Sequence, residues 1–428
     1  MGSVELFLVA IAAVFVIGAA GELVFQRTQI PDVLWLIAVG VLVGPVGGLV
    51  TREQLSQIAP YFAAITLVVV LFEGGSNLRL SDVSRAAPRS TLLALLTFGA
   101  SAALVAVAAQ AARAAGWLPP GWTWTHGALL GCILGGSSSI IVMPAMAVAR
   151  VPARVANLVG LESAFTDAFC VVGAATLIEV LSAAHGIAPS PGAALARAFG
   201  LGAGLGVIAG LGWLFVLRVL RASEHAYTMT LAALFVLYVA IQAAGGSAAL
   251  GILAFGLVVG NADAIGRRVG YARRLDLGRL VRGLHGEVTF MVKSFFFTFL
   301  GAMMGPPWTP FALGLAFGPL LLAARAPMVA LVMAGRGFDG ADRGIATLAV
   351  PRGMAAGVLA TLPAAAGIPG TEALPALVFA CVLSTIVLFA IGFPLARRGA
   401  AAGGEADAEA APATGAAGAA APGGEDPR

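Results

Sequence analysis

Two carboxylates and two hydroxyls share one otherwise apolar run, 155–180, where Glu162 and Asp167 lie beside Ser163 and Thr166. Five residues correspond to about 500° of helix rotation, so the two carboxylates point roughly 140° apart and do not act as a pair on one face. A hard monovalent cation prefers oxygen ligands with a carboxylate among them. Asp167, Ser163 and Thr166 therefore predict a cation site, unless Asp167 is instead neutralised by an arginine.

Five further ionisable residues lie inside apolar runs: Glu73, Glu179, Lys293, Arg325 and Arg352. A charge at the centre of a bilayer costs at least ~2.5–3.5 kcal/mol, so each is a functional candidate or half of an ion pair. Glu73 and Glu179 lie near run ends, where they can reach water. Lys293 is the only lysine among 25 lysines and arginines, which indicates a positional requirement. Arg325 is the natural counter-charge for Glu162.

The composition places these residues in a membrane. Of 428 residues, 59% are hydrophobic and only 11% are charged, whereas soluble proteins carry roughly 25% charged residues. A soluble enzyme of this length is therefore excluded. The three cysteines lie in apolar stretches, which excludes a disulfide scaffold. The net charge of +4 comes from arginines dispersed between apolar runs, which favours membrane topology over nucleic-acid binding.

An all-α polytopic fold follows, because a helix needs about 20 mostly apolar residues to cross the hydrocarbon core. The pattern predicts thirteen membrane-spanning helices, over 4–21, 33–50, 56–74, 90–111, 126–148, 155–180, 195–217, 226–243, 247–262, 287–304, 308–334, 341–365 and 373–396.

The fifth and twelfth predicted helices are interrupted, by Gly135–Ser139 and by Pro351–Gly353. Pairing each helix with the one seven places later gives two inverted repeats of six helices. Paired breaks in corresponding helices then indicate where a transporter binds its substrate. The serines of the first break, Ser138 among them, are candidate ligands.

Loop arginines set the expected orientation. With thirteen helices, only Arg52, Arg113 and Arg197 fall on one side, and the remaining loop arginines fall on the other. We therefore expect an outside N-terminus and a cytoplasmic C-terminus. Residues 399–428 are mostly Ala and Gly with three Pro and no aromatic residue, so we expect a disordered cytoplasmic tail after a transmembrane domain over 1–398.

Several motifs together resemble the monovalent cation:proton antiporters, and most closely the NhaP-type branch that includes animal sodium/proton exchangers. They are Leu71-Phe72-Glu73-Gly74-Gly75, Glu162-Ser163 with Asp167, Phe295-Phe296-Phe297 followed by Gly301, Arg325, and Pro351-Arg352-Gly353. Each motif alone is weak, but they occur in the same order over residues 5–396.

The resemblance implies a role for each site residue. Asp167 would bind the cation and the proton alternately, and Ser163, Thr166 and Ser138 would help to ligate the cation. Glu162 and Arg325 would form a structural ion pair, with Lys293 and Arg352 as supporting charges. The resemblance also implies a homodimer in a bacterial inner membrane. Its mobile core would contain helices 4–6 and 11–13, and the remaining helices would form a dimerisation domain.

Two departures leave the cation undecided between sodium, which we favour, and potassium. The chain has Thr166-Asp167 where relatives usually carry Asn-Asp, and Ser137-Ser138-Ser139 where many carry Thr-Asp-Pro. The serine version is similar to potassium-efflux antiporters. With one titrating carboxylate, we expect electroneutral exchange that supports pH homeostasis.

A cation channel and a sodium-coupled symporter for an organic anion are the alternative functions. Enzymatic activity is not expected, nor is a cofactor or a metal beyond the transported cation. The histidines lie at loops or run ends and show no metal-binding cluster: His126, His185, His225 and His285.

Overall fold

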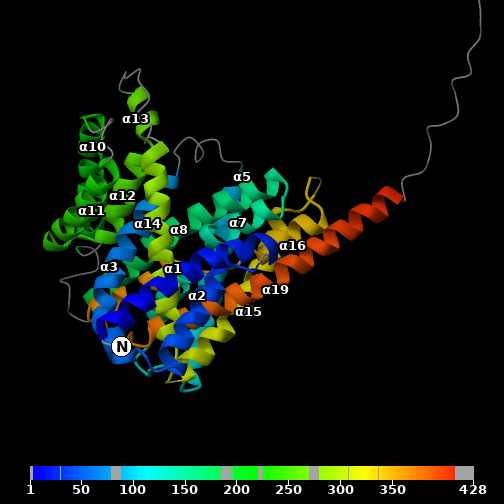
Figure 1. Ribbon diagram of the computed structural model, residues 1–428, viewed down its shortest axis with the longest axis horizontal. Coiled ribbons are helices and arrows are strands. Elements are labelled where there is room, and N and C mark those ends of the chain that lie inside the picture. Colours follow the sequence, from blue (N-terminus) through cyan, green and yellow to red (C-terminus); the bar gives the residue numbers. More distant parts are fainter. Residues whose placement is uncertain are drawn as a thin grey trace, which may run out of the picture.

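A computed structural model describes residues 3–28, 30–78, 88–184, 193, 196–219, 225–268, 279–306, 308–335 and 337–409. Every regular element in these ranges is a helix (Figure 1). The first half contains α1 (Ser3–Thr28), α2 (Asp32–Val41), the π-helix η1 (Leu42–Val46), α3 (Arg52–Asn77), α5 (Pro88–Ala114), α6 (Trp124–Ile133), α7 (Ser139–Val148) and α8 (Ala153–Ala184).

The second half continues the same architecture. It contains the π-helix η2 (Ala198–Ala203), α10 (Gly204–Val219), α11 (Ala226–Ala243), α12 (Ala248–Gly260), α13 (Ala262–Arg268), α14 (Arg279–Ala302), α15 (Trp308–Val332), α16 (Gly340–Leu348), α17 (Met354–Leu359), α18 (Leu362–Ala365) and α19 (Leu374–Glu409).

Seven of the described helices are each long and apolar enough to cross a bilayer on their own: Gln57–Asn77, Pro88–Ala114, Ala153–Ala184, Phe199–Val219, Ala226–Ala243, Trp308–Val332 and Leu374–Arg397. The prediction of an all-α polytopic membrane protein is therefore confirmed. The long uncharged run 226–262 divides where expected, between Ala243 and Ala248, at a turn in which Gly245 has a φ of +74°.

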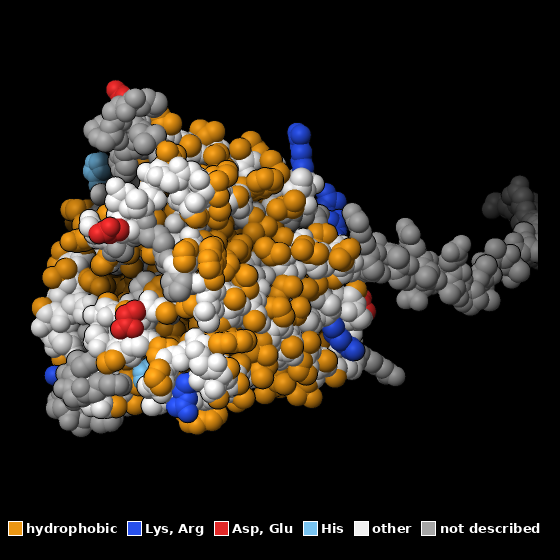
Figure 2. All heavy atoms as spheres, turned by 90° about the horizontal axis from the view of Figure 1, so that it is seen from below, with side chains coloured by type: hydrophobic (Ala, Val, Ile, Leu, Met, Phe, Trp, Pro, Cys, Tyr) orange, Lys and Arg blue, Asp and Glu red, His pale blue; other side chains and the backbone are white. Residues whose placement is uncertain are grey.

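The outer surface fits a lipid environment. Val16, Phe215 and Val236 are 67%, 64% and 70% exposed, although large apolar side chains would normally be buried in a soluble protein. Figure 2 shows hydrophobic side chains over most of one face, with few charged side chains among them. An exposed apolar surface of this extent is expected where hydrocarbon chains, rather than water, surround the helices.

The C-terminal segment differs from the expected disordered tail. The structure continues α19 to Glu409, so residues 399–409 are helical. Alanine has the highest helix propensity, and the last turns of a transmembrane helix provide a nucleus from which an Ala-rich segment can continue. The rest of the predicted tail, 410–428, lies outside the described residues.

Two helices are interrupted near the centre of the molecule. The first break separates α6 from α7, which begins at Ser139, and the second separates α16 from α17, which begins at Met354. The two breaks touch, because the backbone N–H of Ser138 donates a hydrogen bond to the carbonyl of Pro351 at 2.8 Å. Helical bonding is lost in both segments, and this contact satisfies one released backbone group in each of them.

The helices pack in two groups (Figure 1). In one group α5, α6 and α8 pack against one another, α15 packs against α16 and α19, and α5 joins the two sets through α15. In the other group α3 packs on α12, α2 on α14, and α10 on α12. Close backbone approach in the second group leaves no space for a side chain at Gly75 against α12 or at Gly40 against α14.

Candidate functional site

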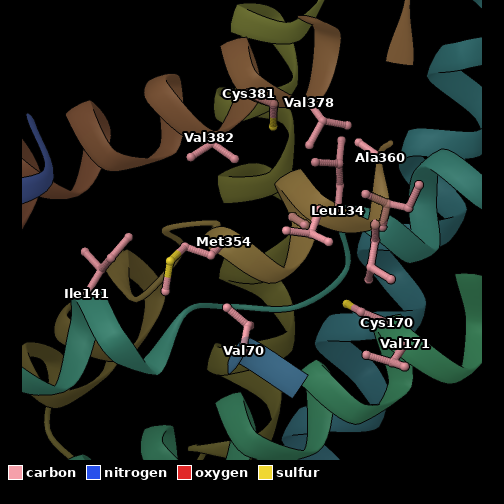
Figure 3. Packing of buried hydrophobic residues seen from close by; sticks show 14 of the residues in the cluster. Val70, Leu134, Ile141, Cys170, Val171, Met354, Ala360, Val378, Cys381 and Val382 are labelled. Carbon is pink, nitrogen blue, oxygen red and sulfur yellow. The ribbon is translucent and has the colours of Figure 1, made fainter. Parts of the chain in front are cut away.

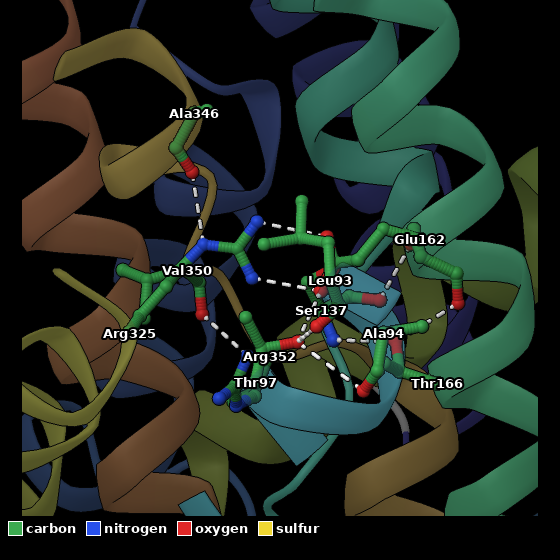
Figure 4. Close-up of polar contacts among 11 residues, drawn as sticks. Leu93, Ala94, Thr97, Ser137, Glu162, Thr166, Arg325, Ala346, Val350 and Arg352 are labelled. Atoms are coloured by element: carbon green, nitrogen blue, oxygen red, sulfur yellow. Dashed lines mark hydrogen bonds and ion pairs between the residues drawn. The ribbon is translucent and has the colours of Figure 1, made fainter. Parts of the chain in front are cut away.

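Glu162 is fully paired in the centre of the first group. Arg325, on α15, donates two hydrogen bonds to its carboxylate, each at 2.8 Å, and a third to the carbonyl of Ala346 at 2.9 Å. Thr97 and Ser137 donate hydroxyl hydrogen bonds to the two carboxylate oxygens at 3.0 and 3.3 Å. Both ionised side chains are buried, and Figure 4 shows the guanidinium between Ala346 and Glu162. This bidentate pair ties α8 to α15.

Two further hydroxyls hold the first break against α8. Ser163 donates to the carbonyl of Ser137 at 2.7 Å, and the backbone N–H of Ser137 donates to Thr166 Oγ1 at 3.3 Å. Thr166 in turn donates to the carbonyl of Ser163 at 3.1 Å. Ser163 and Thr166 are buried and do not line the cavity described next. The structure thus gives them a positioning role, and cation ligation by them stays a prediction.

Asp167 lines a small cavity of about 30 Å³ where the two breaks meet. Ser138 and Gly136 contribute from the first break, and Gly353 and Met354 from the second. This volume can hold one or two water-sized bodies. The structure thus places two of the predicted ligands, Asp167 and Ser138, in one cavity.

The carboxylate of Asp167 has no hydrogen bond or ion pair within the part of the chain that the structure describes. The charges of Glu162, Glu73 and Arg352 lie within electrostatic range of it. An ionised carboxylate in so apolar a setting needs a cation or a proton to neutralise it. The chemistry of the cavity therefore suits either of these two species beside Asp167.

Arg352, in the second break, is 1% exposed, and its side chain and backbone each donate one hydrogen bond. Its Nη1 donates to the carbonyl of Val350 at 3.0 Å, and its backbone N–H donates to Thr385 Oγ1 at 3.0 Å. Its Nε is buried without a hydrogen-bond partner among the described residues. Arg352 therefore stabilises the second break. Its positive charge also partly offsets the negative charges of Asp167 and Glu162.

Lys293 lies in the second helix group and has a partner of its own. Its ammonium contacts the carboxylate of Asp32 at 2.6 Å, which joins α14 to α2. One turn away on α14, Thr289 donates a hydrogen bond to Glu73 at 3.3 Å. The structure therefore does not place Lys293 among the residues that line the Asp167 cavity.

Sequence reasoning missed several of these partners. Asp32 was overlooked because it stands at the start of an apolar run, where a carboxylate can reach water, and Thr97 because a lone threonine in a membrane helix carries no signal. The sulfur-containing residues of the cavity, Cys170 and Met354, count as apolar in a hydropathy pattern. The buried position of Glu162 was a usable signal, because it required a counter-charge.

Comparisons with known proteins identify the family of this chain. The model of the family described as "Sodium/hydrogen exchanger, transmembrane" matches residues 10–397. The K(+)/H(+) antiporter NhaP2 of Shewanella oneidensis is 28% identical in an alignment 381 residues long, which covers 85% of this chain and 61% of the relative. The K(+)/H(+) antiporter NhaP of Alkalimonas amylolytica is 26% identical in an alignment 397 residues long, which covers 90% of this chain and 65% of the relative. The chain thus spans less than two thirds of these curated relatives.

A solved structure shares the fold. The sodium proton antiporter MjNhaP1 of Methanocaldococcus jannaschii matches with a TM-score of 0.68 and 20% identity, over 91% of this chain and 98% of that one. The resemblance drawn from the motifs is confirmed by the family match, which covers nearly all of the helical part. The chain belongs to the sodium/hydrogen exchanger family, in the NhaP branch of the monovalent cation:proton antiporters.

Proposed function

We propose that this protein exchanges protons for a monovalent cation by alternating access at Asp167. The observation that carries the proposal is a carboxylate, without a partner among the described residues, in a cavity at the junction of two broken helices. Ser138 and backbone carbonyls of the breaks supply neutral oxygen ligands beside it. The names of the curated relatives, which are K(+)/H(+) antiporters, support this class of reaction.

The charge count of the cavity defines the cycle. Asp167 crosses as the neutral acid in one direction and as a neutral carboxylate–cation pair in the other. Glu162 already has a counter-charge, because Arg325 donates two hydrogen bonds to its carboxylate, so Asp167 is the carboxylate that we assign to the exchanged ions. A single titrating group gives one proton for one cation, and therefore electroneutral exchange.

An inverted repeat is supported by the packing. Pairing each predicted helix with the one seven places later relates α3 to α14, α12 to α2, and α5 to α15. The contact of α3 with α12 then corresponds to the contact of α14 with α2, and both are extensive. We propose thirteen crossings on this basis, with an outside N-terminus and a bacterial inner-membrane location.

The division of the helices into two groups supports a moving core and a scaffold. Helices α5 to α8 and α15 to α19 carry the site and form the proposed mobile core. The proposed dimerisation part contains α1 to α3 and α10 to α14, with strongly exposed apolar residues such as Ile208 and Val236. A homodimer would bury part of that surface.

The cation is sodium or potassium. The curated relatives are potassium/proton antiporters and the solved neighbour is a sodium/proton antiporter. The cavity offers one carboxylate and neutral oxygen atoms, which suit either ion. Its few polar groups disfavour an organic anion as the substrate. A substrate carboxylate would also be repelled by Asp167, which has no charge partner among the described residues.

Proton flux in proteoliposomes tests the proposal. Purified protein with an enclosed pH dye should move protons when lithium, sodium or potassium is added separately, and Asp167→Asn should not. Cation flux that leaves an imposed proton gradient unchanged would show a channel and contradict exchange. Glu372→Gln is a matched control, because it makes the same kind of carboxylate-to-amide change at an exposed residue outside the cavity lining.

A further inference from the structure

A second cluster of charged side chains lies outside the Asp167 cavity, where α14 contacts α2 and α3. Asp32 and Lys293 form an ion pair at 2.6 Å, and their side chains are 16% and 14% exposed. Glu73, on α3, is half-buried and accepts a hydrogen bond from Thr289 at 3.3 Å. Charged atoms at the surface of a membrane protein contact water rather than hydrocarbon, which would be costly. The cluster therefore lies where water enters between the helices.

Glu73 lies between this cluster and the cavity. Val70 lines the cavity, and Figure 3 shows it beside the extended segment of the first break. Glu73 follows Val70 by three residues, so the two side chains are neighbours on the surface of α3. Glu73 is within electrostatic range of Asp167, and Lys293 is within electrostatic range of Glu73. A cation that enters along α3 thus meets Glu73 before it reaches Asp167.

Lys293 has two carboxylates within reach. Thr289, which contacts Glu73, precedes Lys293 by four residues, so their side chains lie one turn apart on the same face of α14. One turn is about 5.4 Å, and the flexible stem of a lysine can cover it. The ammonium instead contacts Asp32 and lies 5.5 Å from the centre of the Phe290 ring. Glu73 has no ion pair among the described residues, so its charge is available to an entering cation.

We propose that Asp32 is a positioning residue, which holds the ammonium of Lys293 away from Glu73 and so keeps the entry to the Asp167 cavity negatively charged. Without the Asp32 carboxylate, Lys293 pairs with Glu73. Its tethered positive charge then repels an entering cation and weakens cation binding, although the residues that line the cavity are unchanged. The effect on transport rests on the proposed function, whereas the position of Lys293 does not.

Exchange kinetics in proteoliposomes test the effect on transport. Asp32→Asn should raise the apparent Michaelis constant for sodium or potassium several-fold, with a maximal rate close to that of the wild type. Asp32→Asn/Lys293→Gln should return the constant to that of Lys293→Gln, because no ammonium is left to pair with Glu73. A merely structural ion pair would show no such recovery. Glu372→Gln, at an exposed residue outside the cavity lining, should leave the constant unchanged.

The position of Lys293 can be followed directly, because it is the only lysine of the chain. Reductive methylation with isotope-labelled formaldehyde labels this side chain and the N-terminal amine, and it preserves the positive charge. Glu73→Gln should move the methyl NMR signal of Lys293 more in Asp32→Asn than in protein that keeps Asp32, because only the former brings the ammonium to Glu73. Asp32→Ser replaces Asp32→Asn in both experiments if Asp32→Asn does not fold.

The two experiments decide different parts. An unchanged Michaelis constant in Asp32→Asn, or one that stays raised in the double variant, would overturn the role in cation entry. A Lys293 signal that responds equally to Glu73→Gln with and without Asp32 would overturn the repositioning of the ammonium. If the wild type exchanges nothing, the proposed function fails, and the methyl signal alone decides whether Asp32 holds Lys293 away from Glu73.

Discussion

The two carboxylates of α8 lie five residues apart and have opposite surroundings. Glu162 receives hydrogen bonds from Arg325, Thr97 and Ser137, whereas Asp167 borders a cavity and receives none among the described residues. Both are costly in a membrane protein interior, but only the first has been compensated by the protein itself. The difference supports a structural role for Glu162 and the proposed transport role for Asp167, on the same helix.

The network around Glu162 also explains the geometry of the cavity. Ser137 belongs to the first break, and it contacts both Glu162 and Ser163. The next residue, Ser138, lines the cavity with Asp167. Glu162 thus fixes Ser137 in the first break, and the next residue, Ser138, faces the same cavity as Asp167.

The largest expected effect comes from neutralising the unpaired carboxylate. Asp167→Asn keeps the shape of the side chain and removes no hydrogen bond found in the structure, so the protein should fold with an unchanged melting temperature in detergent. Exchange in proteoliposomes should fall to the level of empty liposomes. Retained exchange would show that a residue other than Asp167 binds the exchanged ions.

Substitution of the paired carboxylate, Glu162, should instead reduce the stability of the fold. Glu162→Gln or Arg325→Ala leaves a buried charge without its partner, which costs about 3–5 kcal/mol of folding free energy. Thermal melting in detergent should therefore show a marked loss of stability for either variant. The doubly reversed variant Glu162→Arg/Arg325→Glu should recover part of it, and single variants that melt like the wild type would refute the structural role.

The hydroxyls sharpen the same contrast. Ser138→Ala removes a cavity-lining oxygen and should raise the apparent Michaelis constant for the cation several-fold, with little effect on stability. Thr166→Val removes a buried acceptor for the N–H of Ser137, and should lower the free energy of unfolding by about 1–3 kcal/mol. A Michaelis constant that changes in Thr166→Val but not in Ser138→Ala would reverse these two roles and make Thr166 the ligand.

The sequence predicted the charges better than their neighbours. Buried charges are rare and costly in apolar runs, so Glu162, Arg325 and Asp167 could be found by type alone. The partners Thr97 and Asp32 could not, because their residue types are common in many settings and their contacts join segments far apart in the chain. Likewise, Gly and Pro indicated the two breaks, but the Ser138–Pro351 hydrogen bond depends on how the halves meet.

The smallest expected effect is that of membrane potential. Because Lys293 is paired with Asp32 outside the cavity lining, its proton does not enter the charge count. A potential of 100 mV is worth about 2.3 kcal/mol per charge moved, so electroneutral exchange should proceed at the same rate with or without it. A valinomycin-set potassium diffusion potential tests sodium/proton exchange, and acceleration or slowing would indicate a second exchanged proton.

Proton release on cation binding tests the central assignment most directly. Purified protein in weakly buffered detergent solution with a pH indicator should release about one proton per chain when saturating sodium or potassium is added, at a pH where Asp167 is protonated. Glu372→Gln, at an exposed residue outside the cavity lining, should release the same amount, and Asp167→Asn should release none. Equal release from Asp167→Asn and the wild type would contradict the assignment of Asp167 as the group that binds proton and cation in turn.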